Sequence, residues 1–166
     1  TQTAGIIKQA FLAPKVKKTF ERVVELDPRH VQARIGLAQY LLNAPGIMGG
    51  DTEAGWKQLE EVVRLDEVQG RMVRARAYER EKRTTDAESD WKTLVPHHGG
   101  NWRVWKGVAG FSLRENKLDD ALKGMKKYVE LRPDTADAYA SLGEVLLKKG
   151  EFEPANEQIG RSLRMD

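Results

Sequence analysis

Small residues recur at two positions of a repeating apolar pattern along the chain. The first position holds Ala75, Ala109 and Gly143, and equivalent residues stand 34 positions apart. The second position, twelve residues further on, holds Ala87, Ala121 and Ala155. A large apolar residue follows the second position by four residues in each unit: Trp91, Met125 and Ile159. A period of this length predicts a stack of equivalent helical units.

Each unit is predicted to be a pair of antiparallel helices. The spacing of Leu118, Leu122 and Met125 is that of one face of a helix. A small residue on each helix lets the two backbones approach closely, and the large residues beside it fill the groove. Pro28 and Pro133 end the second helix of their units, because proline lacks the backbone N–H. We therefore expect Ala121 and Ala155 to be almost completely buried.

The same pattern extends towards the N-terminus with one insertion. Ala38 and Gly55 occupy the two small positions, and Val16, Phe20 and Val23 resemble the second half of a still earlier unit. The predicted fold is an all-α solenoid of about ten helices in a single domain. Its parts are an N-terminal hairpin (1–30), a repeat with an inserted loop (31–67), a degenerate repeat (68–101) and two further repeats (102–135 and 136–166).

The last two units carry a recognisable motif. It reads Trp105, Val108-Ala109, Leu118, Ala121, Met125, Tyr128, Pro133, then Tyr139, Leu142-Gly143, Phe152, Ala155, Ile159. From about Val16 to its end, the chain resembles tetratricopeptide-repeat proteins. The resemblance implies a right-handed superhelix in which the first helix of each unit lines a concave groove. The unit 68–101 departs from the pattern, with Arg71 and Arg74 where the family prefers Trp and Leu.

The inserted loop 43–51 contains the sequence A-P-G-I-M-G-G. A similar loop occurs in a set of bacterial, largely uncharacterised tetratricopeptide-repeat proteins, so the resemblance leaves bacterial periplasm and cytoplasm open and slightly favours the periplasm. The residues themselves predict a structural turn. Asn43 or Gly46 ends one helix, Gly49-Gly50 allows positive φ, and Asp51 caps the next helix. We expect Ile47 and Met48 to pack on a neighbouring helix.

The composition of the chain excludes several kinds of functional site. The chain has no cysteine, which excludes disulfides, thiol catalysis and Cys-ligated metal. It has 28 basic and 25 acidic residues, and a net charge of +3 permits an acidic partner without requiring one. No apolar run approaches the roughly 20 residues that a membrane-spanning helix needs.

No group of side chains forms a catalytic or metal-binding pattern. The adjacent His97 and His98 are predicted to be solvated loop residues, because neighbouring histidines rarely chelate one ion well. The serines fall inside helical segments rather than at a nucleophile elbow. We expect no enzymatic activity, no cofactor and no metal. Of the tryptophans, Trp91 and Trp105 are predicted to be core residues, and Trp56 and Trp102 to be partly exposed.

The basic segment 71–83, with six basic and two acidic residues, is the best functional candidate. The family geometry implies that the groove displays Gln39, Asn43, Met72, Arg76, Arg80, Arg103, Lys106 and Arg114. Basic side chains would then converge in its centre, and arginine binds carboxylates in a bidentate manner. The carboxylate clamp of chaperone-binding relatives requires Lys and Asn where Ile35 and Gln39 stand, which argues against chaperone-tail binding.

These features favour a non-catalytic scaffold that binds a protein or peptide segment, with an acidic one as an option. The alternatives are RNA binding by the same basic face, which the balanced charge and the acidic last unit disfavour, and an accessory subunit of a larger assembly. The last unit has no capping helix after it, so we expect it to expose edges of whichever residues the preceding unit leaves uncovered among Tyr139, Val145, Leu146, Ile159 and Leu163. We expect either a native chain that continues past Asp166 or a homodimer through this unit.

Overall fold

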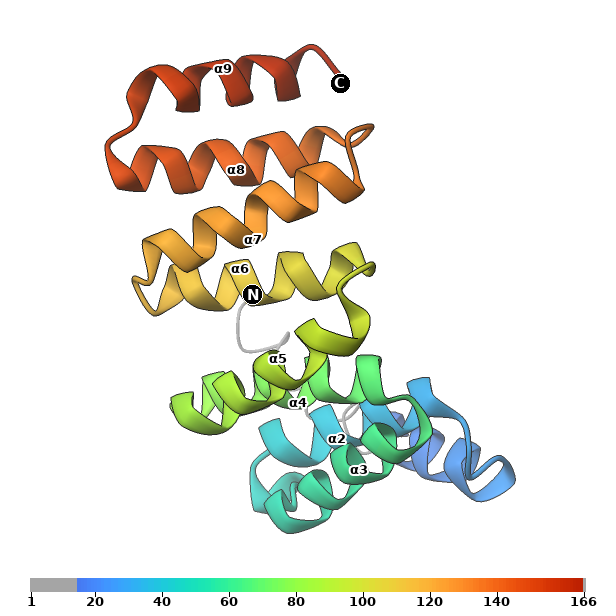
Figure 1. Cartoon of the computed structure of the whole chain (residues 1–166). Coiled ribbons are helices and arrows are strands. Elements are labelled where there is room, and N and C mark those ends of the chain that lie inside the picture. Colours follow the sequence, from blue (N-terminus) through green and yellow to red (C-terminus); the bar gives the residue numbers. More distant parts are fainter. Residues whose placement is uncertain (1–14, 166) are drawn as a thin grey trace, which may run out of the picture. The chain divides into compact units, whose positions relative to one another are not determined.

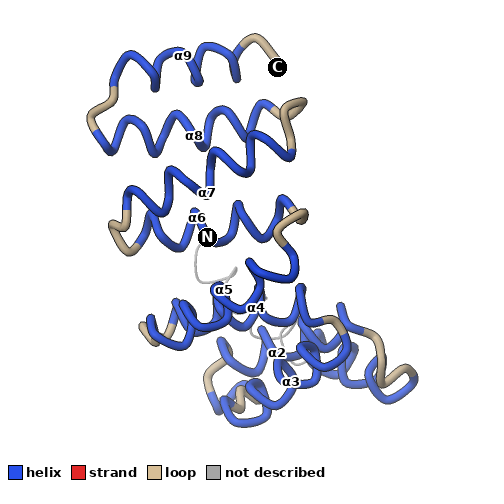
Figure 2. Tube along the Cα trace, viewed as in Figure 1, coloured by secondary structure: helices blue, strands red, loops and turns tan. Residues whose placement is uncertain are grey.

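The computed structural model describes residues 15–165. The first part of the expected N-terminal hairpin, including Pro14, lies outside the described residues. Within the described part of the chain, helices joined by short turns account for the whole fold, without a strand (Figure 2). The all-α solenoid predicted from the sequence is therefore confirmed.

The helices follow one another at nearly regular intervals. Residues 15–26 are helical and precede α2 (Val31–Asn43), the 3-10 turn η1 (Gly46–Met48), α3 (Thr52–Leu65), α4 (Glu67–Arg80), α5 (Thr84–His98), α6 (Trp102–Arg114), α7 (Leu118–Leu131), α8 (Ala136–Lys149) and α9 (Phe152–Leu163). Side-chain caps help to set their ends, because the first N–H groups of a helix have no partner within it. Asp51 accepts from the Ala54 N–H at 3.0 Å, and Asn101 accepts from the Arg103 N–H at 3.0 Å.

The chain forms two compact units whose boundary falls within α4, after Arg74. The first unit contains the helix 15–26, α2, α3 and the beginning of α4. The second unit contains the end of α4 and α5 to α9. In the second unit α6 packs on α7, α7 on α8 and α8 on α9, so these four helices lie side by side (Figure 1). This stack carries the site described below.

The predicted small positions are the places where helices touch. Ala121 and Ala155 are completely buried, as expected, and so are Ala75, Ala87 and Ala109. A Cβ atom placed at Gly143 would lie 2.6 Å from Cγ1 of Ile159, so only glycine allows α8 and α9 to come this close. The repeat register derived from the sequence is therefore correct for this unit.

Replacing Ala121 with leucine should test that register directly. Ala121 belongs to the core cluster around Met125, Tyr128 and Leu142, which leaves no space for three more carbon atoms. Overpacking of this kind costs about 1–3 kcal/mol of unfolding free energy. Thermal or urea unfolding of A121L would measure the loss. The matched change at the exposed Ala140 of α8 should be nearly neutral, and equal stability of A121L and the parent protein would refute the packing described here.

The apolar surface of the last unit includes only part of the expected set. Tyr139, Val145 and Leu146 are at most 5% exposed and present no open edge. They are covered because α8 is packed between α7 and α9. Leu163, which was among the residues expected to be uncovered, is 71% exposed, and Leu147, Phe152 and Met165 are exposed as well.

The inserted loop is a closed turn held by backbone hydrogen bonds. α2 ends at Asn43, and the Gly50 N–H donates to the Pro45 oxygen at 3.1 Å. Gly49 has a φ of 87°, and a Cβ at Gly50 would lie 1.8 Å from the Ala44 oxygen, which explains both glycines. Ile47 is 98% exposed, so the expectation that it packs on a helix was wrong. It belongs to η1, no residue of which is buried.

The histidine pair also differs from the expectation. His97 and His98 form the last turn of α5 and are not loop residues. The helix continues through Pro96, which stands two residues before its C-terminal end. Pro154 lies in the first turn of α9, where a helix tolerates proline because the N–H groups of that turn have no partner within the helix. None of the helices that the structure describes combines the length and the apolar character needed to cross a bilayer.

Candidate functional site

A cavity of about 340 Å³ lies on the face of α6 in the second unit. Its apolar and backbone lining comes from Gly107, Gly110, Leu113 and Met125, and charged side chains surround it. These charged residues are Arg76, Lys106, Arg114, Glu144 and Lys148. Four cations therefore stand against one carboxylate in the lining, and we call this cavity the basic groove.

Helical spacing explains how the groove forms. Gly107, Gly110 and Arg114 lie three and four residues apart on α6 and therefore share one face. Gly110 leaves room there, since a Cβ on it would meet only the end of the Arg114 side chain, at 3.3 Å. Arg76 comes from the end of α4, and Glu144 and Lys148 come from α8. Consecutive first helices of the repeats thus place one or two charges each at the same opening.

Two of the four cations are already paired. Nζ of Lys106 lies 2.7 Å from Oδ2 of Asp137, and Nη2 of Arg114 lies 2.6 Å from Oε2 of Glu79. The Glu79 side chain is only 14% exposed, and it also accepts from Nε1–H of Trp91 at 3.1 Å. Glu79 thus positions Arg114.

Arg76 and Lys148 carry the remaining positive charge. Neither forms an ion pair with another residue that the structure describes. Both belong to the exposed class of residues. The groove therefore keeps two cationic side chains that can bind an added anion without first breaking a contact within the protein.

The Lys106–Asp137 pair extends to a buried tyrosine. The hydroxyl of Tyr128 donates to Oδ2 of Asp137 at 2.7 Å, and Tyr128 is 1% exposed. Burial, together with the hydrogen bond to Asp137, raises the pKa of Tyr128 to about 12. Burial opposes ionisation of Asp137, but the hydrogen bonds from Lys106 and Tyr128 outweigh it and hold the pKa of Asp137 below its usual value.

The raised pKa of Tyr128 predicts a loss of stability at alkaline pH. The stability that Tyr128 contributes as a neutral phenol is fully present below the ordinary phenol pKa of 10.0. It is lost as the pH rises towards about 12, because Tyr128 ionises at lower pH in the unfolded chain than in the folded protein. A shift of this size corresponds to about 2–3 kcal/mol. Urea unfolding of the parent and of Y128F across this range should show a smaller alkaline loss in the variant. Parallel pH dependences of the two proteins would contradict the assignment.

The predicted site residues divide between the two units. Gln39, Asn43 and Met72 belong to the first unit, where the Asn43 side chain donates to the Gln39 backbone oxygen at 2.5 Å. In the second unit the structure brings Arg76, Lys106 and Arg114 together at the basic groove.

The other two basic residues of the prediction do not line the basic groove. Arg80 and Arg103 are both exposed. Arg103 instead stacks on Trp102, with its guanidinium carbon 4.6 Å from the ring centroid. The set of groove residues proposed from the sequence remains a prediction, since no bound partner is present.

The structure adds six lining residues to that set: Gly107, Gly110, Leu113, Met125, Glu144 and Lys148. The repeat period indicates the last of them, because Lys148 stands one period after Arg114. Met125 had been expected to lie only in the core, and it is 5% exposed. It lines the groove from α7.

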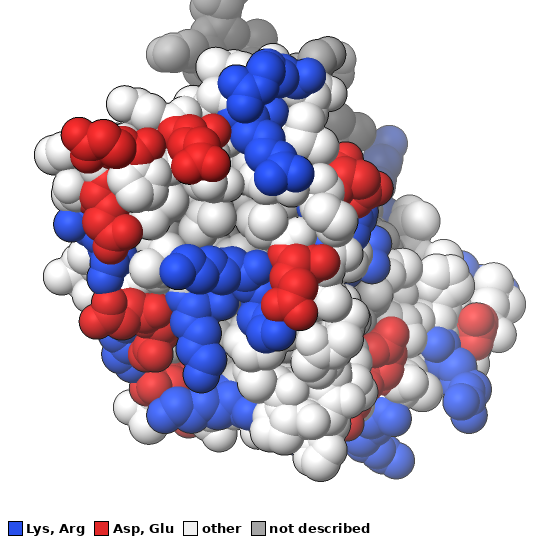
Figure 3. Space-filling view, turned by 45° about the horizontal axis from the view of Figure 1, so that its top comes forward, with Lys and Arg blue, Asp and Glu red and all other residues white. Residues whose placement is uncertain are grey.

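The surface charge is mixed. On the face drawn in Figure 3, basic and acidic side chains alternate, and no wide area of one sign is seen. Among the described residues, no group of three or more His, Cys, Asp or Glu side chains could hold a metal ion. The face drawn in Figure 3 therefore carries no extended basic area.

Comparisons with known proteins identify the repeat. Residues 112–163 match a tetratricopeptide repeat family model. No curated protein matches the chain.

Solved structures resemble the chain closely in fold. A structure of MamA has a TM-score of 0.65 and 16% identity over 90% of this chain and 85% of that one. A MamA fragment from Desulfovibrio magneticus RS-1 has a TM-score of 0.64 and 14% identity, with 95% and 94% covered. PilF of Pseudomonas aeruginosa has a TM-score of 0.69 and 15% identity, with 99% and 74% covered.

The resemblance that the sequence motifs indicated is confirmed by these findings. The matched residues 112–163 begin near the end of α6 and run to the end of α9, which is the stack with completely buried alanines at its helix contacts. At identities this low the solved structures establish the fold and nothing further. The chain therefore contains tetratricopeptide repeats and has the fold of a tetratricopeptide-repeat protein.

Proposed function

We propose that this protein is a non-catalytic interaction scaffold and that the basic groove of its second unit binds an acidic segment of a partner protein. The observation that carries the proposal is the composition of the groove: four cationic side chains and one carboxylate around an apolar floor. Such a lining suits a segment that alternates carboxylates with apolar side chains. Tetratricopeptide repeats are a class of fold that binds proteins, which supports the scaffold role.

We infer different roles for the four cations. Arg76 and Lys148 stand on α4 and α8 and are available to pair with incoming carboxylates. Lys106 and Arg114 are held in place by Asp137 and Glu79, so they are pre-oriented and lose little freedom on binding. Leu113 and Met125 offer apolar contact between them. This arrangement favours a short extended peptide with carboxylates on either side of an apolar residue.

RNA binding through the same face is the alternative that the charge count leaves open. The alternation of charge in Figure 3 argues against it, because nucleic-acid-binding proteins concentrate basic residues along one face. Aromatic stacking platforms for bases are also not part of the groove lining. We therefore favour a peptide, and RNA is a competing outcome of the test below.

The test measures binding of a labelled peptide that alternates glutamate and leucine by fluorescence anisotropy. The variant R76E/K148E should weaken binding at least about tenfold, since two charge-assisted contacts become repulsive. The control K18E/K126E makes the same change in net charge at two exposed lysines that do not line the groove, and it should bind like the parent protein.

Three outcomes would overturn the proposal. The two double variants could weaken binding equally, which would mean that only net charge matters. The lysine-for-glutamate version of the peptide could bind as well as the acidic one. A uridine-rich RNA could bind more tightly than the peptide and lose affinity steeply as salt rises, which is typical of phosphate contacts.

A further inference from the structure

An apolar stripe on α9 is left without a covering helix. In Figure 1 α9 lies at the outer edge of the stack, next to α8. Four residues of α9 follow one another at intervals of four, three and four and therefore share one side of the helix: Phe152, Asn156, Ile159 and Leu163. Phe152 is 60% exposed and Leu163 is 71% exposed, although both are large and apolar. Exposed apolar residues that lie together mark an interaction surface. We call these four residues the α9 stripe.

The repeat explains why the α9 stripe exists. One period earlier, the equivalent residues of α7 are Leu118, Leu122, Met125 and Val129. All of them are at least partly buried, and Leu122 and Val129 pack against the core cluster that α6 to α9 share. α7 has a neighbouring helix on each side, α6 and α8, whereas among the described helices only α8 makes an extensive contact with α9. The side that is buried in α7 is therefore open in α9.

The α9 stripe fits a second copy of itself. Its intervals of four, three and four are the same in both directions along the helix. When two copies of α9 pack antiparallel, Phe152 of each copy therefore lies opposite Leu163 of the other. Asn156 and Ile159 then face each other in the middle of the contact. A contact of this kind uses the same surface on both copies, so it closes on itself and gives a dimer rather than a chain of copies.

Charges beside the α9 stripe fit the same arrangement. Glu153 stands in the first turn of α9, and Arg164 is its C-cap residue. Both are exposed, and neither forms an ion pair with another residue that the structure describes. The Arg164 guanidinium lies over Gly160, where a Cβ would be 3.4 Å from Nη1, and Glu153 stands seven residues before Gly160 on the same side of the helix. Antiparallel packing therefore brings Glu153 of each copy next to Arg164 of the other.

We propose that this protein forms a symmetric dimer in which the α9 stripes of two copies pack antiparallel. The contact between Phe152 and Leu163 occurs twice, and two Glu153–Arg164 pairs between the copies fix the direction of packing. The contact is small, because α9 has 12 residues and is about 18 Å long. We therefore expect a reversible dimer with a dissociation constant on the order of 10–100 µM. The dimer contact shares no residue with the lining of the basic groove, so it does not depend on peptide binding.

Sedimentation velocity of the protein over a dilution series of roughly 5–500 µM measures the association. The parent protein should change reversibly from monomer to dimer and form no larger species. L163E places a carboxylate opposite Phe152 and should weaken the dimer at least about tenfold. The matched control is L26E, because Leu26 is 69% exposed and belongs to the first unit. L26E should dimerise like the parent protein, and circular dichroism confirms the fold of each variant.

Charge variants test the antiparallel direction. E153R and R164E should each weaken the dimer roughly fivefold, because both ion pairs between the copies become repulsive. The double variant E153R/R164E restores the two pairs with exchanged charges and should dimerise like the parent protein. An equimolar mixture of E153R and R164E should form a heterodimer, since each protein then supplies the charge that the other lacks.

Four results would overturn the proposal. The parent protein could remain a monomer at the highest concentration, which would leave the α9 stripe to a different partner. It could form species that grow beyond the dimer, as a head-to-tail contact does. L26E could weaken the dimer as much as L163E. The single charge variants could dimerise like the parent protein, or the double variant and the mixture could fail to recover the dimer.

Discussion

Replacing Trp91 with alanine is expected to cost about 3–5 kcal/mol of unfolding free energy, the largest effect of any substitution considered for this protein. Trp91 is 1% exposed and packs against α6 at Gly107. Its removal opens a large cavity and leaves Glu79, which is 14% exposed, without the Nε1–H that it accepts. Urea unfolding of W91A should show the loss as a lower midpoint with an unchanged slope.

The matched control is Trp102, which is less buried and stacks on Tyr128 with ring centroids 5.4 Å apart. W102A should cost less unfolding free energy, since Trp102 is only partly buried. Equal losses of unfolding free energy in W91A and W102A would mean that the difference in burial between the two rings does not determine how much each contributes to stability. W91F should fall between W91A and the parent, because it keeps the ring but not the hydrogen bond to Glu79.

The second large effect is expected at two glycines of α6, Gly107 and Gly110, where substitution by alanine should change the stability of the protein in opposite directions. A Cβ at Gly107 would lie 2.4 Å from two atoms of the Trp91 ring, whereas a Cβ at Gly110 would meet only the end of the Arg114 side chain at 3.3 Å. Alanine is the better helix former by roughly 1 kcal/mol. G110A should therefore stabilise the protein by about 0.5–1 kcal/mol. G107A should destabilise it by about 1–3 kcal/mol, since the buried indole cannot move away.

A double-mutant cycle tests the cause. In the W91A background the obstacle to a Cβ at Gly107 is gone, so G107A should become neutral or stabilising. Thermal unfolding of the four proteins of the cycle would measure the coupling. A destabilising G107A that persists in W91A would mean that the contact with the indole is not its cause.

The sequence determined the repeat and its register. Alanine and glycine at fixed intervals, with large apolar residues four positions later, were sufficient to predict the helices and the burial of Ala121 and Ala155. Helix ends were also predictable where a cap or a proline marks them, as at Asp51 and Pro133. These features are local, because a turn of helix depends on residues three and four positions away.

The candidate site was predictable only in outline. The position of a residue on a helix indicates which face it occupies, and this brought Arg76, Lys106 and Arg114 to one surface. It did not reveal that Glu79 holds Arg114 or that Arg103 stacks on Trp102. The first pairing joins side chains of two different helices, and the second depends on the rotamer that the Arg103 side chain adopts. A periodic sequence pattern indicates neither.

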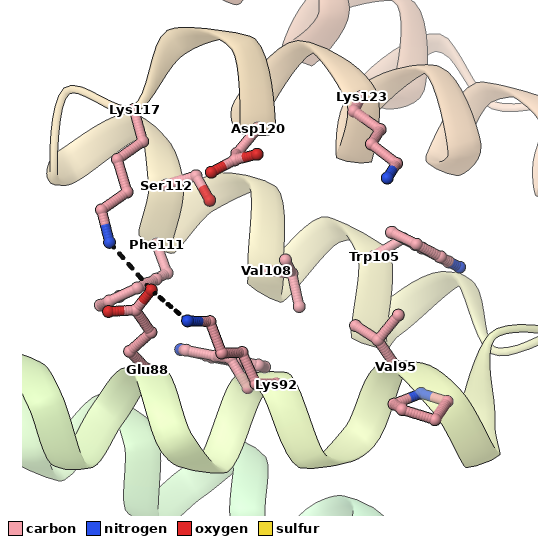
Figure 4. A pocket seen from close by; sticks show the side chains of 12 residues that line it. Glu88, Lys92, Val95, Trp105, Val108, Phe111, Ser112, Lys117, Asp120 and Lys123 are labelled. Atoms are coloured by element: carbon pink, nitrogen blue, oxygen red, sulfur yellow. Dashed lines mark hydrogen bonds and ion pairs between the residues drawn. The ribbon is translucent and has the colours of Figure 1, made fainter.

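The tertiary structure alone decided what remains open to solvent. From the sequence, Ile47 was assigned the wrong exposure, since burial depends on which neighbouring helix covers a residue. Trp105 and Ser112 were interpreted only as core and helix residues, yet they line a cavity of about 320 Å³ together with residues of α5 and α7 (Figure 4). Which residues line a cavity depends on how whole helices pack on one another, and this packing is a property of the assembled stack.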